Sequence, residues 1–197
     1  MINPAHFNNL YQADADPWNV TSDWYERRKR ELVLASLPRE RYRHGFEPGC
    51  GNGEMTMRLL DRCDQLCAVD FSEKAVQLCI KRTDHVPEER LDLRTMPLPF
   101  SWPDVPHEGF DLIIVSEIAY YFDDEALARF YERSISSLSP GGHLLMCHWR
   151  HPAHDRQQNS ETLHQRLKEH PHLFSILLLQ DLDFEIGVWI KHVKEES

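Results

Sequence analysis

The amino-acid sequence predicts an α/β fold with a doubly wound, mostly parallel seven-stranded sheet that ends in a C-terminal antiparallel hairpin. Three observations predict this fold. Short apolar runs show little polar alternation, as strands buried on both faces require. Segments with apolar residues at helical spacing separate these runs, which indicates parallel strands joined by right-handed crossovers. Near the C-terminus two strand-like runs are only four residues apart, too close for a crossover helix, so they must pair antiparallel.

The first expected elements are a helix over residues 24–37 and a short strand that ends at Phe46. The inward-facing residues of the helix are predicted to be Leu32, Val33 and Leu37. The basic run from Arg27 to Lys29 would then lie in solvent.

The middle of the chain continues the alternation of strands and helices. Buried strands are expected at residues 66–70, 110–115 and 143–148. Helical spacing predicts three inward faces, which carry Met55, Leu59, Leu60 and Cys63; Val76, Cys79 and Ile80 behind a Ser72 cap; and Leu127, Phe130, Tyr131, Ile135 and Leu138 behind Asp123 or Asp124. The two runs of the terminal hairpin are residues 174–179 and 184–191.

The composition excludes several classes of protein. A length of 197 residues suffices for one well-packed core and is short for two, so residues 1–197 are expected to form a single domain. With 32 acidic against 22 basic residues, the formal charge of −10 disfavours nucleic acid and membrane surfaces as partners. The longest purely aliphatic runs are four residues and no signal-peptide pattern is present, so a cytoplasmic protein without a transmembrane helix is expected. The oligomeric state is not predicted.

The cysteines and histidines give no metal site. The five cysteines are odd in number and contain no C-x-x-C pair, so they are interpreted as reduced core residues. The histidines between residues 143 and 154 lack an acidic or thiol partner at the usual offsets, so no metal is predicted there.

A glycine-rich loop at residues 47–53, EPGCGNG, follows the first strand and precedes the next helix. Glycines let the backbone turn sharply and let its N–H groups approach a ligand that a Cβ would exclude. The third glycine of a dinucleotide pyrophosphate loop would fall at position 54, which is Glu54, and a carboxylate there is unfavourable for a pyrophosphate. Asp70, seventeen residues after Gly53, ends the second strand and can accept both hydroxyls of a ribose.

These residues suit a ligand that combines adenosine with an amino acid and carries no phosphate. Glu47 and Asp70 supply two carboxylates for its ammonium and hydroxyl groups. A nicotinamide-dependent oxidoreductase is the alternative, and Glu54 and the terminal hairpin oppose it. A protein that binds such a cofactor without catalysis is the other alternative.

Several segments resemble known motifs. Residues 46–53 (FEPGCGNG), 68–70 (AVD), 110–117 (FDLIIVSE) and 138–142 (LSPGG) resemble the ordered motifs of class I S-adenosylmethionine-dependent methyltransferases. Residues 7–11 (FNNLY) with 16–18 (DPW), 24–26 (WYE) and 116–121 (SEIAYY) resemble the nodulation protein S group, whose best-known members N-methylate the terminal amino sugar of chitin-derived signals. The resemblance implies a Rossmann-like methyltransferase fold with S-adenosyl-L-methionine as cofactor and S-adenosyl-L-homocysteine as product. It also implies a small-molecule acceptor, an amine such as an amino sugar.

The resemblance implies which residues hold the methionine part of the cofactor. Gly49, Cys50 and Gly51 would contact it through backbone atoms. Glu47 would orient the same end through its amino group or a water molecule. Apart from the resemblance, Arg28 in the N-terminal part is expected to pair with the carboxylate of the methionine.

The adenosine part is assigned in the same way. Asp70 would hold the ribose hydroxyls, Phe71 would lie against the adenine, and Ser116 would line the pocket. Many relatives have an acidic residue for the adenine amine where this chain has Arg94 and Thr95, so these two residues are taken as the adenine contacts.

The acceptor is expected over the carboxyl ends of the strands, as in other doubly wound sheets. The hypothesis is that Glu117 or His148 binds and deprotonates the acceptor amine. Tyr120, Tyr121 and Trp149 would pack on the acceptor. The alternative is that His148 satisfies a backbone carbonyl and that the tyrosines only pack at a helix cap.

The chain therefore divides into three expected parts: an N-terminal cap at residues 1–40, a cofactor-binding core at residues 44–150, and a substrate loop, helix and hairpin at residues 151–197. The N-terminal part is polar but carries the aromatic residues Phe7, Tyr11, Trp18, Trp24 and Tyr25. It is expected to fold as a lid over the cofactor, with Trp18 also facing the substrate. Ordinary packing of these aromatic rings on the sheet edge is the alternative.

Overall fold

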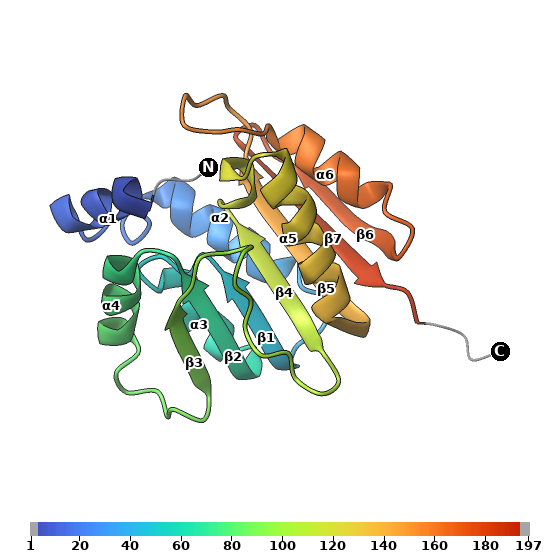
Figure 1. Ribbon diagram of the computed structural model, residues 1–197, viewed down its shortest axis with the longest axis horizontal. Coiled ribbons are helices and arrows are strands. Elements are labelled where there is room, and N and C mark those ends of the chain that lie inside the picture. Colours follow the sequence, from blue (N-terminus) through green and yellow to red (C-terminus); the bar gives the residue numbers. More distant parts are fainter. Residues whose placement is uncertain (1–3, 194–197) are drawn as a thin grey trace.

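The structure is a computed structural model that describes residues 4–193, and a seven-stranded sheet forms its centre (Figure 1). The strands are β1 (Tyr42–Pro48), β2 (Cys63–Asp70), β3 (Leu91–Thr95), β4 (Phe110–Ser116), β5 (Leu138–Trp149), β6 (Leu173–Gln180) and β7 (Phe184–Lys191). They lie in the order β3-β2-β1-β4-β5-β7-β6. The first five are mutually parallel, and β7 pairs antiparallel with both β5 and β6. The predicted fold class, including the terminal hairpin, is confirmed.

Helices cover both faces of this sheet (Figure 1). They are α1 (Pro4–Ala13), α2 (Trp24–Ala35), α3 (Glu54–Leu60), α4 (Glu73–Arg82), the short helix η1 (Ala119–Tyr121), α5 (Asp124–Ser137) and α6 (Ser160–Lys168). α5 and α6 pack on one face, and α2 and α3 pack on the other. α4 lies beside α3 against β2 and β3. Within residues 4–193, every helix is too short or too polar to cross a lipid bilayer.

Two predicted helix caps are confirmed. The hydroxyl of Ser72 accepts a hydrogen bond from the Ala75 N–H (3.2 Å) at the start of α4. The carboxylate of Asp123 does the same for the Ala126 N–H (3.0 Å) at the start of α5. Each cap satisfies a backbone donor that the first turn of a helix leaves without a partner.

The connection from β3 to β4 contains no helix. Instead, Trp102 from residues 96–109 packs on the same face as α5, with its ring centroid 5.2 Å from that of Phe46 and 5.7 Å from that of Phe130. A single large side chain therefore covers part of the sheet where a crossover helix would otherwise lie.

Some predicted positions are wrong at the ends of elements. Cys63 was predicted on a helical face but is the first residue of β2. Helix α3 already ends at Leu60, and Cys63 pairs with Tyr42 of β1. Leu138 begins β5 instead of ending α5, and β1 continues past Phe46 to Pro48. Ile80, predicted to face inward, is 52% exposed.

Helix α2 corrects the expectation for the basic run. The helix ends at Ala35, two residues before the predicted end, and Leu32 is only half-buried. Arg27 is exposed as predicted, but Lys29 is buried. Lys29 lies on the side of α2 that faces the carboxyl ends of the central strands, which has consequences for the site.

The terminal hairpin also reaches these carboxyl ends. Trp149 at the end of β5 pairs with Phe184 at the start of β7. The turn between β6 and β7 is held there by a hydrogen bond from the Arg150 N–H to the Asp183 carbonyl (2.8 Å). The hairpin therefore contributes to the same edge of the sheet as the glycine loop.

Candidate active site

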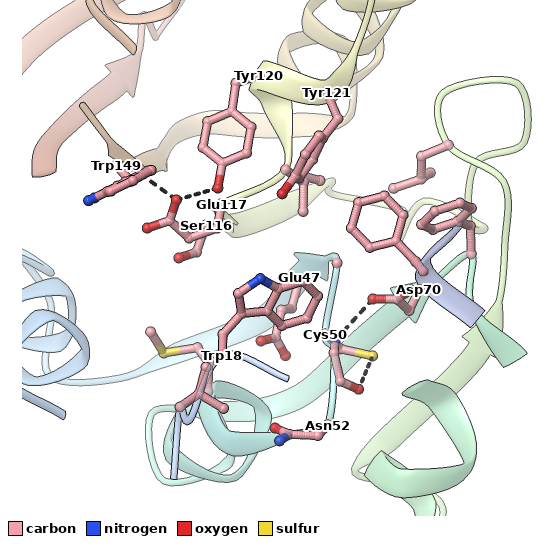
Figure 2. A pocket seen from close by; sticks show the side chains of 18 of the residues that line it. Trp18, Glu47, Cys50, Asn52, Asp70, Ser116, Glu117, Tyr120, Tyr121 and Trp149 are labelled. Atoms are coloured by element: carbon pink, nitrogen blue, oxygen red, sulfur yellow. Dashed lines mark hydrogen bonds between the residues drawn. The ribbon is translucent and has the colours of Figure 1, made fainter. Parts of the chain in front are cut away.

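A cavity of about 970 Å³ opens at the carboxyl ends of the parallel strands. Its walls come from the N-terminal segment, α2, the glycine loop after β1, and the segments that follow β2, β4 and β5. Figure 2 shows Asp70 and the glycine loop on one side of this space, and Glu117 with Trp149 on another. Ligands of doubly wound folds bind at this edge of the sheet. The cavity is therefore the candidate site.

The glycine loop lies against the cavity in the conformation that its sequence predicts. Gly49 and Gly51 have positive φ angles of 82° and 54°, which favour glycine. A Cβ on Gly49 would lie 2.3 Å from Ile118 Cγ2, and one on Gly51 would lie 2.8 Å from the Tyr11 hydroxyl. The loop therefore needs glycine for both its backbone conformation and the close approach of its neighbours.

Asp70 links the glycine loop to the start of α4. One carboxylate oxygen accepts a hydrogen bond from the Gly51 N–H (3.0 Å), and the other accepts one from the Ser72 N–H (2.9 Å). Burial raises the pKa of Asp70 to about 6, although these N–H groups favour the ionised form. Each oxygen keeps a lone pair that can accept a ligand hydroxyl.

Glu47 is buried at the end of β1, where its carboxyl group accepts a hydrogen bond from the Thr56 hydroxyl (2.7 Å). Burial raises the pKa of Glu47 well above its usual range, which favours the protonated form. Glu47 thus presents a polar group with reduced charge to the cavity.

Glu117 is held by a dense set of contacts after β4. One oxygen lies 2.6 Å from the Lys29 ammonium, which also lies 3.0 Å from Glu26. The other oxygen accepts hydrogen bonds from the Tyr120 hydroxyl (2.6 Å) and the Trp149 N–H (3.0 Å), as Figure 2 shows. Burial by itself would raise the pKa of Glu117, but the Lys29 ammonium and the Tyr120 hydroxyl are among the groups that together outweigh it, and the pKa falls to about 2. Glu117 is therefore ionised at neutral pH.

His148 does not line the cavity, which corrects the prediction that it meets the acceptor. It is fully buried in β5, and its Nε2 accepts a hydrogen bond from the Ala119 N–H (3.2 Å). Burial lowers the pKa of His148 to about 3, so the ring is neutral. The imidazole therefore satisfies a backbone group, as the predicted alternative said. This group is the Ala119 N–H donor and not a backbone carbonyl.

Three residues predicted to bind the cofactor also lie away from the cavity. Arg28 points to the terminal hairpin, where its guanidinium lies 2.6 Å from the Asp181 carboxylate. It precedes the inward-facing Lys29 by one residue, and adjacent residues of a helix point in different directions. Arg94 and Thr95 are exposed at the end of β3, and Arg94 pairs with Asp92 (2.7 Å). The neighbouring Met96 lines the cavity in their place.

The structure brings the other predicted site residues together at the cavity wall. They are Trp18, Glu47, Gly49, Cys50, Gly51, Asp70, Phe71, Ser116, Glu117, Tyr120, Tyr121 and Trp149. Their individual roles stay predictions.

The N-terminal segment covers one side of the cavity. The Phe7 ring on α1 lies 5.2 Å from that of Phe71 and 5.0 Å from that of Tyr121. The hydroxyl of Ser72 donates a hydrogen bond to the Asn8 side chain (2.6 Å), which ties α1 to the start of α4. Trp18 follows in the same segment and lines the cavity.

Sequence reasoning missed several cavity residues, among them Lys29, Arg30, Asp155 and Arg156. Lys29 stands three positions after Glu26, a spacing that predicts an ion pair on a helix and therefore was a usable signal. Arg30 is buried and donates to the Val20 carbonyl (3.0 Å), while its Nε has no hydrogen-bond partner within the described residues. Asp155 and Arg156 lie on the loop after β5, where no sequence pattern singles them out.

Comparisons with known proteins agree with this geometry. A family model described as a methyltransferase domain matches residues 46–142. A Pseudomonas syringae protein assigned as a methyltransferase is 41% identical, and its structure aligns over 86% of this chain and 100% of its own with a TM-score of 0.72. The N-methyltransferase NodS from Bradyrhizobium japonicum WM9, in complex with S-adenosylhomocysteine, is 25% identical and aligns over 96% of this chain and 99% of its own with a TM-score of 0.82.

Nodulation protein S of Rhizobium tropici is 30% identical over 145 residues, which are 70% of this chain. The chain spans 56% of the length of that curated relative. Neither these proteins nor the family model supports the alternative of a nicotinamide-dependent oxidoreductase. With the glycine loop, Asp70 and the adjoining cavity, these similarities show that the chain belongs to the S-adenosylmethionine-dependent methyltransferases, whose cofactor is S-adenosylmethionine.

Proposed function

We propose that this protein transfers the methyl group of S-adenosylmethionine to the nitrogen of a small amine, such as an amino sugar. The observation that carries the proposal is that one cavity reaches from the glycine loop and Asp70 to Tyr120 and Trp149. Its volume, about 970 Å³, is at the upper end of what a single small ligand occupies, so a cofactor and a small acceptor can share it. Similarity to the N-methyltransferase NodS supports nitrogen as the methylated atom.

The residues on the cavity wall fit the proposed cofactor. Asp70 has a free lone pair on each oxygen for the ribose hydroxyls, and the turn at Gly49 and Gly51 leaves no Cβ between the backbone and a ligand. Phe71 offers a flat apolar surface for the adenine. We assign the methionine carboxylate to Arg30 instead of Arg28, because Arg30 lines the cavity and has a buried Nε without a partner in the described chain.

When bound, S-adenosylmethionine supplies an electrophilic methyl group on a positively charged sulfur. The protein must hold the amine nitrogen in line with it and exclude water, and alignment alone can lower the barrier by about 7 to 11 kcal/mol. Glu117 holds two residues beside the proposed acceptor position. It accepts hydrogen bonds from the hydroxyl of Tyr120 and from the backbone N–H of Trp149. Both aromatic rings can then pack on the acceptor.

The two residues predicted as bases are poorly suited to accept a proton. Glu117 has a pKa of about 2 and both of its oxygens are hydrogen-bonded. His148 has a pKa of about 3 and lies behind the cavity wall. An efficient base has a pKa near the working pH. In this proposal Glu117 is therefore a positioning residue, and the amine reacts in its neutral form after losing its proton to water.

Calorimetry and product analysis test the proposal. The protein is expected to bind S-adenosylhomocysteine and not NAD. With S-adenosylmethionine and a panel of amines and matched alcohols, mass spectrometry should find a methyl group on nitrogen. Transfer to hydroxyl groups alone would overturn the proposed acceptor class. Tight binding of S-adenosylhomocysteine with no transfer to any acceptor would instead favour a protein that binds the cofactor without catalysis.

A further inference from the structure

Arg156 is a cation of the cavity wall that has no counterion in the described chain. Three cationic side chains line the cavity among the residues that the structure describes. Lys29 lies 2.6 Å from Glu117. Arg30 lies 3.5 Å from Glu54. Arg156 forms no ion pair with any described carboxylate. Charged groups that are shielded from water are normally paired, so an anionic ligand can balance this charge.

The guanidinium of Arg156 is held by stacking and by one of its edges. Its central carbon lies 3.8 Å from the ring centroid of Tyr120 and 4.5 Å from that of Trp149. Its Nη1 donates to the His151 carbonyl (3.1 Å) and to the Trp149 carbonyl (3.4 Å). These contacts orient the group before a ligand arrives.

The other edge of the same guanidinium, formed by Nε and Nη2, is unpaired. Nε of Arg156 is buried without a hydrogen-bond partner, and no described residue accepts a hydrogen bond from Nη2. Stacking occupies the faces of the planar group and leaves its in-plane N–H groups free. An Nε–Nη2 edge presents two parallel N–H groups, which match two oxygens of a carboxylate or a phosphate. Because buried polar groups nearly always have a partner, this edge indicates where an oxyanion binds.

The cofactor does not account for this edge. S-adenosylmethionine carries one carboxylate and no phosphate, and its carboxylate is assigned to Arg30. Arg30 lies near Glu54 at the start of α3, next to the glycine loop. Arg156 instead follows β5 and contacts Tyr120 and Trp149, which are proposed to pack on the acceptor. The oxyanion that suits Arg156 therefore belongs to the acceptor.

The nearest acidic residues in the chain and hairpin do not neutralise Arg156. Asp183 lies 2.8 Å from a ring nitrogen of His151. Asp155 precedes Arg156 in the chain but forms no ion pair with it within the described residues. The guanidinium therefore keeps its charge for a ligand, and the Asp155 carboxylate can accept an amine N–H of the same ligand.

We infer that the acceptor is an amine that also carries a carboxylate or a phosphate, and that Arg156 binds this oxyanion through its Nε–Nη2 edge. The inference rests on the proposed N-methylation and makes Arg156 a specificity-determining residue. An acceptor held at its oxyanion directs its nitrogen towards the methyl group. Arg156 takes no part in the bond changes. The methyl carbon bonds to nitrogen, the sulfur keeps the electron pair of the broken C–S bond, and the nitrogen takes over the positive charge.

Matched acceptor pairs test the inference. Each pair shares an amine and differs in the oxyanion: phosphoethanolamine with ethanolamine, glucosamine 6-phosphate with glucosamine, and β-alanine with β-alaninamide. The first two pairs report on a phosphate and the third on a carboxylate. In at least one pair, wild-type protein should use the anionic member with a kcat/KM at least about tenfold above that of the neutral member. Equal or better use of the neutral member in all three pairs would overturn the inference.

Variants of Arg156 test whether its guanidinium carries the preference. Arg156→Gln should lower kcat/KM at least about tenfold for the anionic member and less than about threefold for the neutral one, with an unchanged Kd of S-adenosylhomocysteine. Arg156→Lys keeps the charge without the two-pronged edge, so it should keep only part of the preference. The control is Arg41→Gln, which removes an exposed arginine outside the cavity and should change neither rate. An equal loss for both members of a pair would mean that Arg156 only supports its loop, and would overturn the inference.

Calorimetry with the protein saturated in S-adenosylhomocysteine separates the two proposals. Anionic amines that bind, more weakly in Arg156→Gln, but are not methylated would support the inference and remove the proposed reaction. Methylation of nitrogen with no preference for the anionic members would support the reaction and remove the role of Arg156. Methyl transfer to the carboxylate or phosphate oxygen would overturn both, because that group would then lie at the sulfonium. If the amines neither bind nor react, both proposals fail.

Discussion

At the scale of single residues, Glu117 has an uncommon backbone conformation. Its φ angle is +60°, a left-handed value that costs energy in a residue with a Cβ. The conformation lets the side chain reach back to the Trp149 N–H while it also meets Lys29 and Tyr120. Several charge-assisted contacts therefore offset the strain and join α2, η1 and β5 at one carboxylate.

Replacing Lys29 should lower the stability of the fold, because it leaves a buried negative charge without a partner. Lys29→Met leaves the carboxylate of Glu117 without its cationic partner, so the free energy of unfolding in urea at neutral pH should fall by about 3 kcal/mol. Adding Glu117→Gln should recover part of this loss, because the uncompensated charge is gone. The control is Lys81→Met on an exposed position of α4, expected within about 0.5 kcal/mol of wild type. Equal stability of Lys29→Met and wild type would contradict the ion pair.

The same pair predicts a dependence of stability on pH. The pKa of Glu117 in the folded protein, about 2, is below its ordinary value of 4.5. The stabilising contribution is therefore complete above about pH 4.5 and is lost as the pH falls towards 2. Urea denaturation between pH 7 and 3 should show a smaller loss of stability in Glu117→Gln than in wild-type protein. Parallel curves for the two proteins would contradict the lowered pKa.

Cofactor affinity should depend on pH through Asp70. Its pKa of about 6 means that the free protein takes up a proton there under mildly acidic conditions, and a protonated carboxyl accepts ligand hydroxyls less well. The affinity for S-adenosylhomocysteine should therefore fall up to about tenfold per pH unit below about pH 6. Calorimetry across pH 5 to 8 measures this. Asp70→Asn should bind weakly at every pH, and a similar pH slope in that variant would assign the effect to another group.

At the scale of elements, the N-terminal segment and the glycine loop depend on each other. The Tyr11 hydroxyl lies 2.8 Å from the position that a Cβ on Gly51 would take, and the Asn52 amide donates to the Ala15 carbonyl (3.3 Å). Phe7 adds an aromatic contact with Phe71, which follows β2. The segment has little apolar surface of its own, so these contacts with the site hold it in place.

Deleting residues 1–20 should weaken cofactor binding. The deletion removes α1 and Trp18 from one wall of the cavity, and leaves the sheet with its own apolar layers on both faces. The Kd of S-adenosylhomocysteine should rise at least about tenfold, while the circular dichroism spectrum keeps its α/β shape. Unchanged affinity would show that the segment packs beside the site without acting as a lid.

At the scale of the whole molecule, negative charge is concentrated at the site. The chain has a formal charge of −10, and nine of the described acidic side chains line one cavity that contains three cationic side chains. Among these nine, burial favours the protonated form of Glu47, which leaves the acidic groups in excess. Clefts lined by one sign of charge raise the local concentration of ligands of the opposite sign. The distribution therefore favours a cofactor with a sulfonium group and an acceptor with an amine.

Ionic strength should affect a cationic acceptor more than a neutral one. Salt screens charges over a Debye length that shrinks from about 10 Å at 0.1 M to about 3 Å at 1 M. For a polyamine acceptor, kcat/KM should fall as sodium chloride rises over this range, with a smaller change for a monoamine that is mostly neutral at the assay pH. Equal salt sensitivity of the two acceptors would show that the charge of the cavity does not steer them.

The sequence by itself determined the alternation of strands and helices in the core, the terminal hairpin, the glycine loop and Asp70. These features are local, since strand alternation, helical spacing and the offset between a strand end and the next acid all lie within short segments. Topology rules then bring the carboxyl ends of parallel strands together, which is why Glu47, Asp70 and Glu117 were expected at one site.

Only the tertiary structure decided which neighbouring side chains enter the cavity. Lys29 and Arg30 face the site while Arg28 turns to the hairpin, because the rotation of α2 about its axis depends on how it packs across the sheet. Trp149 faces the cavity while His148 lies behind it, since strand alternation separates adjacent side chains but does not say which face is open. The contact between Lys29 and Glu117 joins residues 88 positions apart, and the placement of Asp155 and Arg156 at the cavity depends on a loop folded back onto Tyr120. Such long-range pairings follow from packing, and no local pattern in the sequence encodes them.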